Sequence, residues 1–240
     1  MKNVIEVETI TRVEDRDPPA QVMRSLCQLF GGIAAMLIAI VAGTAAGTVG
    51  ALRAGSLTDL ATQLVAVVGI SVPAFVTGAV LLIVFAAKLG IAPVGGWHGL
   101  RSMLLPAIAL SLAPTAYVTR LVRSQMMEQM SAQYVRTARA KGLSTRQAAL
   151  RHALRNAFLP VLSYLGPATA VAVTGSFVVE RVFAVPGIGK HFVDAVLTKD
   201  ITVLMGVVLV LSTFVILLNL AVDVLYAWID PRTAVPAGAR

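Results

Sequence analysis

Cysteine is almost absent from this sequence: Cys27 stands alone among 240 residues, so no disulfide can form within the chain. Charged residues are also scarce, at 13% of the chain, against about 25% in an average soluble domain. Apolar residues make up 57%, and the mean hydropathy is +0.81. A chain of this size cannot bury so much apolar surface in its own core, so we expect lipid to cover part of it.

Residues that support catalysis or metal binding are equally sparse. His98, His152 and His191 fall in three different predicted loops, and no Ser-His-Asp, Cys-His or paired-carboxylate arrangement can be read. The string PGIGK at 186–190 superficially matches a phosphate-binding loop, but Ala184 stands where that loop needs its first glycine. We therefore predict no catalytic residue, no metal and no cofactor, and we interpret 186–190 as an external turn before a short re-entrant helix.

The net charge of +8 has two interpretations, nucleic-acid binding or the positive charge of cytoplasmic membrane loops. The basic residues gather in loops beside apolar runs, which is typical of membrane topology. We therefore predict contact with membrane lipid and no binding of nucleic acid.

Five apolar runs are long enough to cross a hydrocarbon core, which needs about 20 helical residues. The sequence thus predicts an all-α, multi-pass bundle, with one membrane domain over 29–229 between an N-terminal tail, 1–28, and a cytoplasmic C-terminal tail, 230–240. The predicted spans lie near 29–50, 60–88, 102–123, 157–180 and 201–229.

Small residues and prolines mark the first three runs. Ala39, Gly43 and Gly47 repeat every four positions, a pattern that lets another helix approach closely. That helix could belong to a second subunit or to this chain, and we favour internal packing. Proline removes a backbone donor and bends a helix; it interrupts the second and third runs at Pro73, Pro106 and Pro114.

The segment between the third and fourth runs is the most informative part of the chain. Residues 120–156 hold eight Lys and Arg and one acidic residue, Glu128, which predicts a cytoplasmic location. Within it we predict a pair of short helices over 131–155. Ser131 is the expected N-cap of the first helix, Gly142 takes the left-handed conformation that ends it, and Leu143 packs against that cap.

The second helix of the pair begins with a capping box formed by Ser144 and Gln147. It is expected to place Leu150, Ala153, Leu154 and Phe158 on one face, with its arginines elsewhere. The pair could insert into a groove on a cytoplasmic motor, or it could rest on anionic lipid as an amphipathic element. Physical chemistry leaves both open, and the position of Gly142 favours a fixed turn.

Counting spans back from this cytoplasmic segment places the N-terminal tail outside. Residues 1–28 contain four basic and five acidic side chains and no apolar stretch that would form a signal peptide. These charges would have to cross the membrane with no span before them. We therefore expect that a first helix is missing.

The string YVRTARAKGL…RHALRNAFLP closely resembles the cytoplasmic loop of ABC importer permeases, in particular the dipeptide, oligopeptide and nickel subgroup with type I transmembrane domains. Ala138 and Gly142 match the Glu-Ala-Ala…Gly pattern of that loop, while Arg136 and Thr137 replace Glu-Ala, as is typical of the peptide subgroup. Three further strings match in order, so the resemblance covers roughly residues 25–233: GISVPAF at 69–75, VFAVPGIGK at 182–190 and NLAVDVLYAWIDPR at 219–232.

The resemblance implies a permease subunit in the bacterial plasma membrane. Such a subunit pairs with a second, similar permease, with two cytoplasmic ABC ATPase subunits that hydrolyse ATP, and with an external solute-binding protein. It imports di- or oligopeptides, nickel or a related solute. Members usually begin with an extra helix and a long external segment, so we expect either that this sequence starts late or that it is a shortened relative. The resemblance assigns ATPase coupling to Ala138, Lys141, Gly142 and Leu143.

Two other functions stay open at this point. An ion-coupled secondary transporter would use Asp223 in the last run as a proton relay, although the position of Asp223 near the cytoplasmic end favours a structural role. A shortened, non-transporting remnant would bind its partners without forming a pathway.

Overall fold

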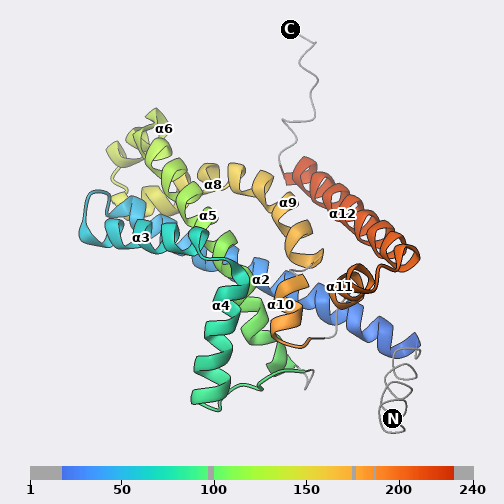
Figure 1. The fold of residues 1–240 in the computed structure, drawn as a ribbon. Helices are drawn as coiled ribbons and strands as arrows, with labels where there is room; N and C mark the ends of the chain where they lie inside the picture. Colours follow the sequence, from blue (N-terminus) through green and yellow to red (C-terminus); the bar gives the residue numbers. More distant parts are fainter. Residues whose placement is uncertain (1–17, 97–99, 175–176, 186–187, 230–240) are drawn as a thin grey trace, which may run out of the picture.

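The computed structural model describes residues 18–96, 100–174, 177–185 and 188–229, and every regular element in these ranges is helical (Figure 1). The predicted all-α class is confirmed. Of the two predicted tails, residues 1–17 and 230–240 lie outside the described ranges.

Three helical segments among the described residues are long and apolar enough to cross a membrane. They are Phe30–Leu52 in α2 (Pro18–Leu52), Arg101–Ser131, which contains α5 (Leu104–Ser131), and Ile201–Ala221 in α12 (Ile201–Ile229). The predicted runs 29–50, 102–123 and 201–229 fall on them. The prolines do not interrupt α5. Pro106 lies in its first turn, where backbone N–H groups have no helical partner, and the helix continues through Pro114.

The predicted second span, 60–88, is a broken pair of helices. α3 (Leu57–Ser71) and α4 (Ala74–Leu81), which a π-helical turn extends over Leu82–Lys88, meet at an angle of 102°. The break falls at Val72, whose backbone is extended, with φ −86° and ψ 120°. Pro73 causes it, because proline lacks the N–H that would continue α3 and drives the residue before it out of the helical region.

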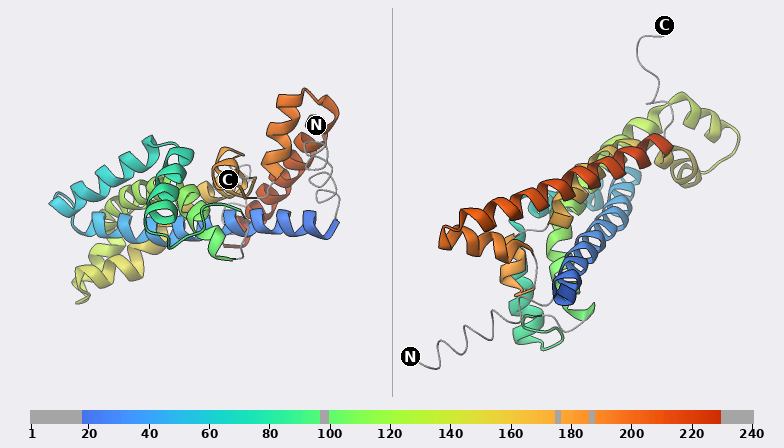
Figure 2. Two further views of the ribbon diagram at one scale, coloured as in Figure 1. Left: turned by 60° about the horizontal axis from the view of Figure 1, so that its bottom comes forward. Right: turned by 90° about the vertical axis from the view of Figure 1, so that its right-hand side faces the viewer.

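The predicted fourth span, 157–180, is also divided. It forms α9 (Leu159–Thr174) and α10 (Phe177–Val182). α9 has 16 residues, fewer than the roughly 20 that cross a hydrocarbon core. A short helix, α11 (Ile188–Thr198), follows the predicted turn and folds back against α12 (Figure 2). Asp200 caps α12 by accepting from the N–H groups of Thr202 and Val203, each at 3.1 Å.

α5 forms the centre of the molecule, packing against α2, α3, α4, α9 and α10 and against the helices that follow it (Figure 1). Its largest contact is with α2 and uses the stripe of small residues. Ala39 is fully buried. A Cβ atom on Gly43 would lie 2.9 Å from the carbonyl oxygen of Thr115, and one on Gly47 would lie 2.6 Å from that of Thr119. The favoured interpretation, internal packing, is therefore confirmed.

Candidate coupling site

The C-terminal end of α5 leads directly into the predicted helix pair. α5 runs to Ser131, and the extended residue Ala132 (φ −68°, ψ 150°) is the N-cap of α6 (Gln133–Ala140). The prediction that Ser131 caps this helix was wrong. Its hydroxyl instead donates to the carbonyl of Glu128 at 2.7 Å. This bond back to the preceding turn keeps Ser131 inside α5 and moves the break one residue on.

α6 ends in the left-handed turn that the sequence predicts at Gly142. Gly142 has φ +94°, a conformation that costs glycine little and a residue with a Cβ considerably more. Its N–H donates to the carbonyl of Arg139 at 3.0 Å, and the N–H of Leu143 donates to that of Ala138 at 3.3 Å. These two bonds are the Schellman pattern, which satisfies carbonyls that the end of a helix leaves without partners.

The second helix of the pair starts with the predicted capping box. The hydroxyl of Ser144 accepts from the N–H of Gln147 at 3.3 Å, and the N–H of Ser144 donates to the side-chain oxygen of Gln147 at 3.0 Å. The helix then runs through three short pieces without leaving helical geometry: α7 (Thr145–Ala148), a π-helical turn over Ala149–Ala153, and α8 (Leu154–Ala157). The pair therefore has a defined start and a defined turn.

The π-helical turn changes which side chains face inward. In it the N–H of Leu154 reaches back five residues to the carbonyl of Ala149, so one extra residue enters the turn and the helix face rotates. Leu150 is 45% exposed, whereas Ala149 and Ala153 are fully buried. The predicted inward position of Leu150 was therefore wrong.

One apolar core fixes the helix pair to α5. Leu143, Leu154 and Phe158 pack at the edge of this core. A polar bridge joins the same elements, because the hydroxyl of Tyr134 donates to Gln129 at 2.6 Å and accepts from Asn156 at 3.0 Å. The pair is thus a rigid extension of the membrane helix. The fully buried residues of the shared core are Val118, Val122, Met126, Val135, Ala148, Ala149, Ala153, Ala157 and Val161.

The structure separates the four predicted coupling residues into two kinds. Lys141 and Gly142 are exposed at the tip of the turn. Ala138 and Leu143 are half-buried and hold the turn together through their hydrogen bond. Further exposed cations lie along the two helices of the pair, and no described carboxylate forms an ion pair with them; they are Arg136, Arg139, Arg146, Arg151 and Arg155. The site offers a rigid, positively charged, convex turn and no chemistry of its own.

A second fixed contact near this end of α5 was missed by sequence reasoning. Asp59 at the start of α3 is 2% exposed and accepts two bonds from Arg123 of α5, from Nε at 2.5 Å and from Nη2 at 2.8 Å. Gly55 and Gln63 donate to the same carboxylate. The signal was present, because Asp59 is the only acidic residue between Asp17 and Glu128, and a lone carboxylate in an apolar run needs a partner.

Charged residues farther along the chain join α10 to α11. The N–H of Gly189 donates to Glu180 at 2.9 Å, and Arg181 pairs with Asp194 at 3.1 Å. These contacts give Glu180 and Arg181 a structural role. Asp223 lies on α12, and its side chain is outside the described residues.

The model of the family described as "Binding-protein-dependent transport system inner membrane component" matches residues 30–235. The chain belongs to this family. It is accordingly a multi-pass protein of the inner membrane, and the helix pair beyond α5 is the segment in which the sequence most closely resembles the permeases of this family.

Individual members of the family that are similar to the chain include two peptide permeases. The dipeptide transport system permease protein DppB of Bacillus subtilis is 41% identical over 201 residues, which are 84% of this chain and 65% of that protein. The oligopeptide transport system permease protein OppB of Escherichia coli K12 is 43% identical over 203 residues, again 84% of this chain and 66% of that protein. The chain thus spans about two thirds of their length.

Among solved structures, an inward-facing conformation of the MetNI methionine ABC transporter contains a chain with the same fold. The TM-score is 0.69 with 17% sequence identity, and the match covers 89% of this chain and 99% of that one. At this identity the likeness establishes the arrangement of helices and nothing more.

Proposed function

We propose that this chain is a permease subunit of an ATP-driven importer and forms half of a solute pathway with a second, similar permease. Two cytoplasmic ATPase subunits bind beneath the pair, and an external solute-binding protein delivers the solute from above. ATP hydrolysis takes place on the ATPase subunits. Family membership supports the transport role, and the names of the relatives support di- or oligopeptides as the solute class.

The observation that carries the proposal is the turn at Gly142. Two capped helices present it at an exposed tip, and the core shared with α5 leaves no flexible joint between the tip and a membrane helix. A groove on one ATPase subunit receives the turn at Lys141 and Gly142, with Ala138 and Leu143 keeping its shape. When ATP closes the two ATPase subunits, the helix pair moves with them and displaces α5, which changes access to the pathway.

Affinity purification of the tagged chain from detergent-solubilised native membranes tests this function. Wild type should co-purify with an ABC ATPase and a second permease. Gly142→Val should retain the permease partner but lose at least about 90% of the ATPase, because a β-branched side chain resists the left-handed conformation that shapes the tip. Gly90→Val is the matched control, since Gly90 also has a positive φ, +63°, but lies beyond α4, far from the tip.

Each outcome has a separate meaning. Purification of the wild-type chain alone, with both partners present in the input membranes, would contradict the importer function. Equal ATPase recovery with Gly142→Val and wild type, at equal abundance, would leave the importer in place and remove the turn from the coupling contact.

A further inference from the structure

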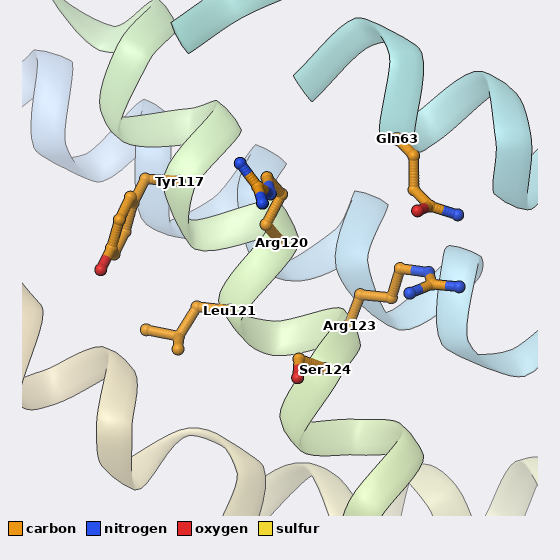
Figure 3. A pocket seen from close by; sticks show the side chains of 6 residues that line it. All are labelled: Gln63, Tyr117, Arg120, Leu121, Arg123 and Ser124. Atoms are coloured by element: carbon orange, nitrogen blue, oxygen red, sulfur yellow. The ribbon is translucent and has the colours of Figure 1, made fainter. Parts of the chain in front are cut away.

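A pocket of about 440 Å³ opens between α3 and α5, close to the Asp59–Arg123 pair. Figure 3 shows Arg120 between Tyr117 and Arg123 on α5, with Gln63 of α3 across from them. The residues of α5 that line the pocket are mostly three or four positions apart, so they lie on one face of the helix. The full lining is Gln63, Tyr117, Arg120, Leu121, Arg123 and Ser124.

The two arginines of this pocket differ in their charge balance. Arg123 is neutralised by the two-point contact with Asp59. Arg120, one turn earlier, is exposed and has no ion pair or hydrogen bond with any described residue. Both lie in the segment Arg101–Ser131, which is apolar enough to span a membrane. An arginine in such a segment needs an anion, an aqueous cavity or access to the interface.

The position of Arg120 along α5 restricts which anion can reach it. It lies in the half of the span that leads into the helix pair, eleven residues before α5 ends at Ser131, on the side of the inner-leaflet head groups. Anionic lipid is concentrated in that leaflet, and basic pockets between membrane helices bind its head groups. Ser124, one turn beyond Arg120, adds a hydroxyl donor on the same face.

The surface beside the pocket suits acyl chains. On α3, Leu60 and Val67 lie one turn before and one turn after Gln63, and they are 52% and 51% exposed. A polar pocket containing an unpaired guanidinium, bordered by exposed apolar side chains, matches the two halves of a phospholipid. We propose that this pocket binds the head group of an anionic phospholipid, with its phosphate oxygens accepting hydrogen bonds from Arg120.

The test uses the assembled transporter purified with its partner subunits and placed in nanodiscs of phosphatidylcholine. Dioleoylphosphatidylglycerol is then titrated in, and lipid retained by the complex is counted by native mass spectrometry. Wild type should retain phosphatidylglycerol in preference to phosphatidylcholine. Arg120→Gln should weaken this binding by about 10-fold, as expected for the loss of about 1.4 kcal/mol from a charge-assisted contact. Arg120→Lys should keep most of it.

Arg53→Gln is the matched control, because it removes the same charge from the exposed α2–α3 loop outside the pocket. A melting temperature in phosphatidylcholine equal to that of wild type shows that Arg120→Gln is folded. Equal retention of phosphatidylglycerol by Arg120→Gln and wild type, or equal losses in Arg120→Gln and Arg53→Gln, overturns the proposal. So does Arg120-dependent binding of the dipeptide Ala-Ala that phosphatidylglycerol does not displace, which would assign the pocket to a solute carboxylate.

Discussion

Asp59 and Arg123 are 64 positions apart in sequence and meet through two hydrogen bonds between a carboxylate and a guanidinium, which join the start of α3 to α5. Such a two-point contact fixes orientation as well as distance. α3, whose start this contact holds against α5, ends at the 102° bend of the broken pair.

Removing one partner of this pair should be worse than removing both. Asp59→Asn and Arg123→Gln should each lower the melting temperature of the detergent-solubilised assembly by several degrees, because each leaves a polar or charged group without its partner. The double variant should lose less than the sum of the two single losses. Thermal unfolding of the four proteins measures this coupling, and strictly additive losses would show that the contact is not formed in the membrane.

The α2–α5 contact predicts opposite outcomes for one substitution at two sites. Gly47→Ala should destabilise the protein by about 1–3 kcal/mol, because the added methyl group meets the backbone of α5. Gly206→Ala on α12, where a Cβ atom meets nothing within 4 Å, should be neutral or gain up to about 1 kcal/mol from helix propensity. Thermal unfolding of both variants compares them directly, and equal effects would be inconsistent with the close approach of α2 and α5.

The capping box should be detectable by hydrogen exchange. Ser144→Ala removes a side-chain acceptor at a helix start, worth about 1 kcal/mol, and should speed exchange of the amides around α7 about 5-fold. Thr145→Ala is the control, because its hydroxyl lies next in sequence but is not the cap. Mass spectrometry of the peptide that covers 144–150 compares the amide exchange rates of the two variants. Identical rates would show that the capping box does not stabilise the start of this helix.

The π-helical turn exposes Leu150, contrary to expectation, and buries its neighbour Ala149. Leu150→Gln should leave stability within about 0.5 kcal/mol of wild type, because the side chain is half in solvent. Ala149→Leu should cost about 1–3 kcal/mol by overfilling a closed core. Abundance in membranes and thermal unfolding of both variants provide the measurement. A larger loss of stability in Leu150→Gln than in Ala149→Leu would show that the regular helix predicted from the sequence is the correct one.

Local signals in the sequence were enough for much of this structure. The turn at Gly142 and the capping box at Ser144 are determined by residues within five positions of each other, and both formed as predicted. The positions of α2, α5 and α12 could also be predicted, because the length of an apolar run is read directly from consecutive residues.

The wrong cap at Ser131 came from a bond to Glu128, three residues away, but other features depend on how the helices pack or bend. Periodicity assumes 3.6 residues per turn throughout, so it could not place Leu150 once the burial of Ala149 and Ala153 against α5 favoured a wider turn. Hydropathy assigned residues 60–88 to one span and could not give the angle that Pro73 produces. The Asp59–Arg123 pair depends on how α3 lies against α5, which no local pattern contains.

The glycines of α2 also limit how the helices can move. Gly43 and Gly47 each lie directly against a backbone carbonyl of α5, one helical turn apart. A small shift along the axis would push bulkier neighbours onto those carbonyls, and the next favourable register is four residues away, about 6 Å at 1.5 Å per residue. The two helices therefore either move together as one rigid body or change register by a full helical turn. Gradual sliding of α2 along α5 is excluded.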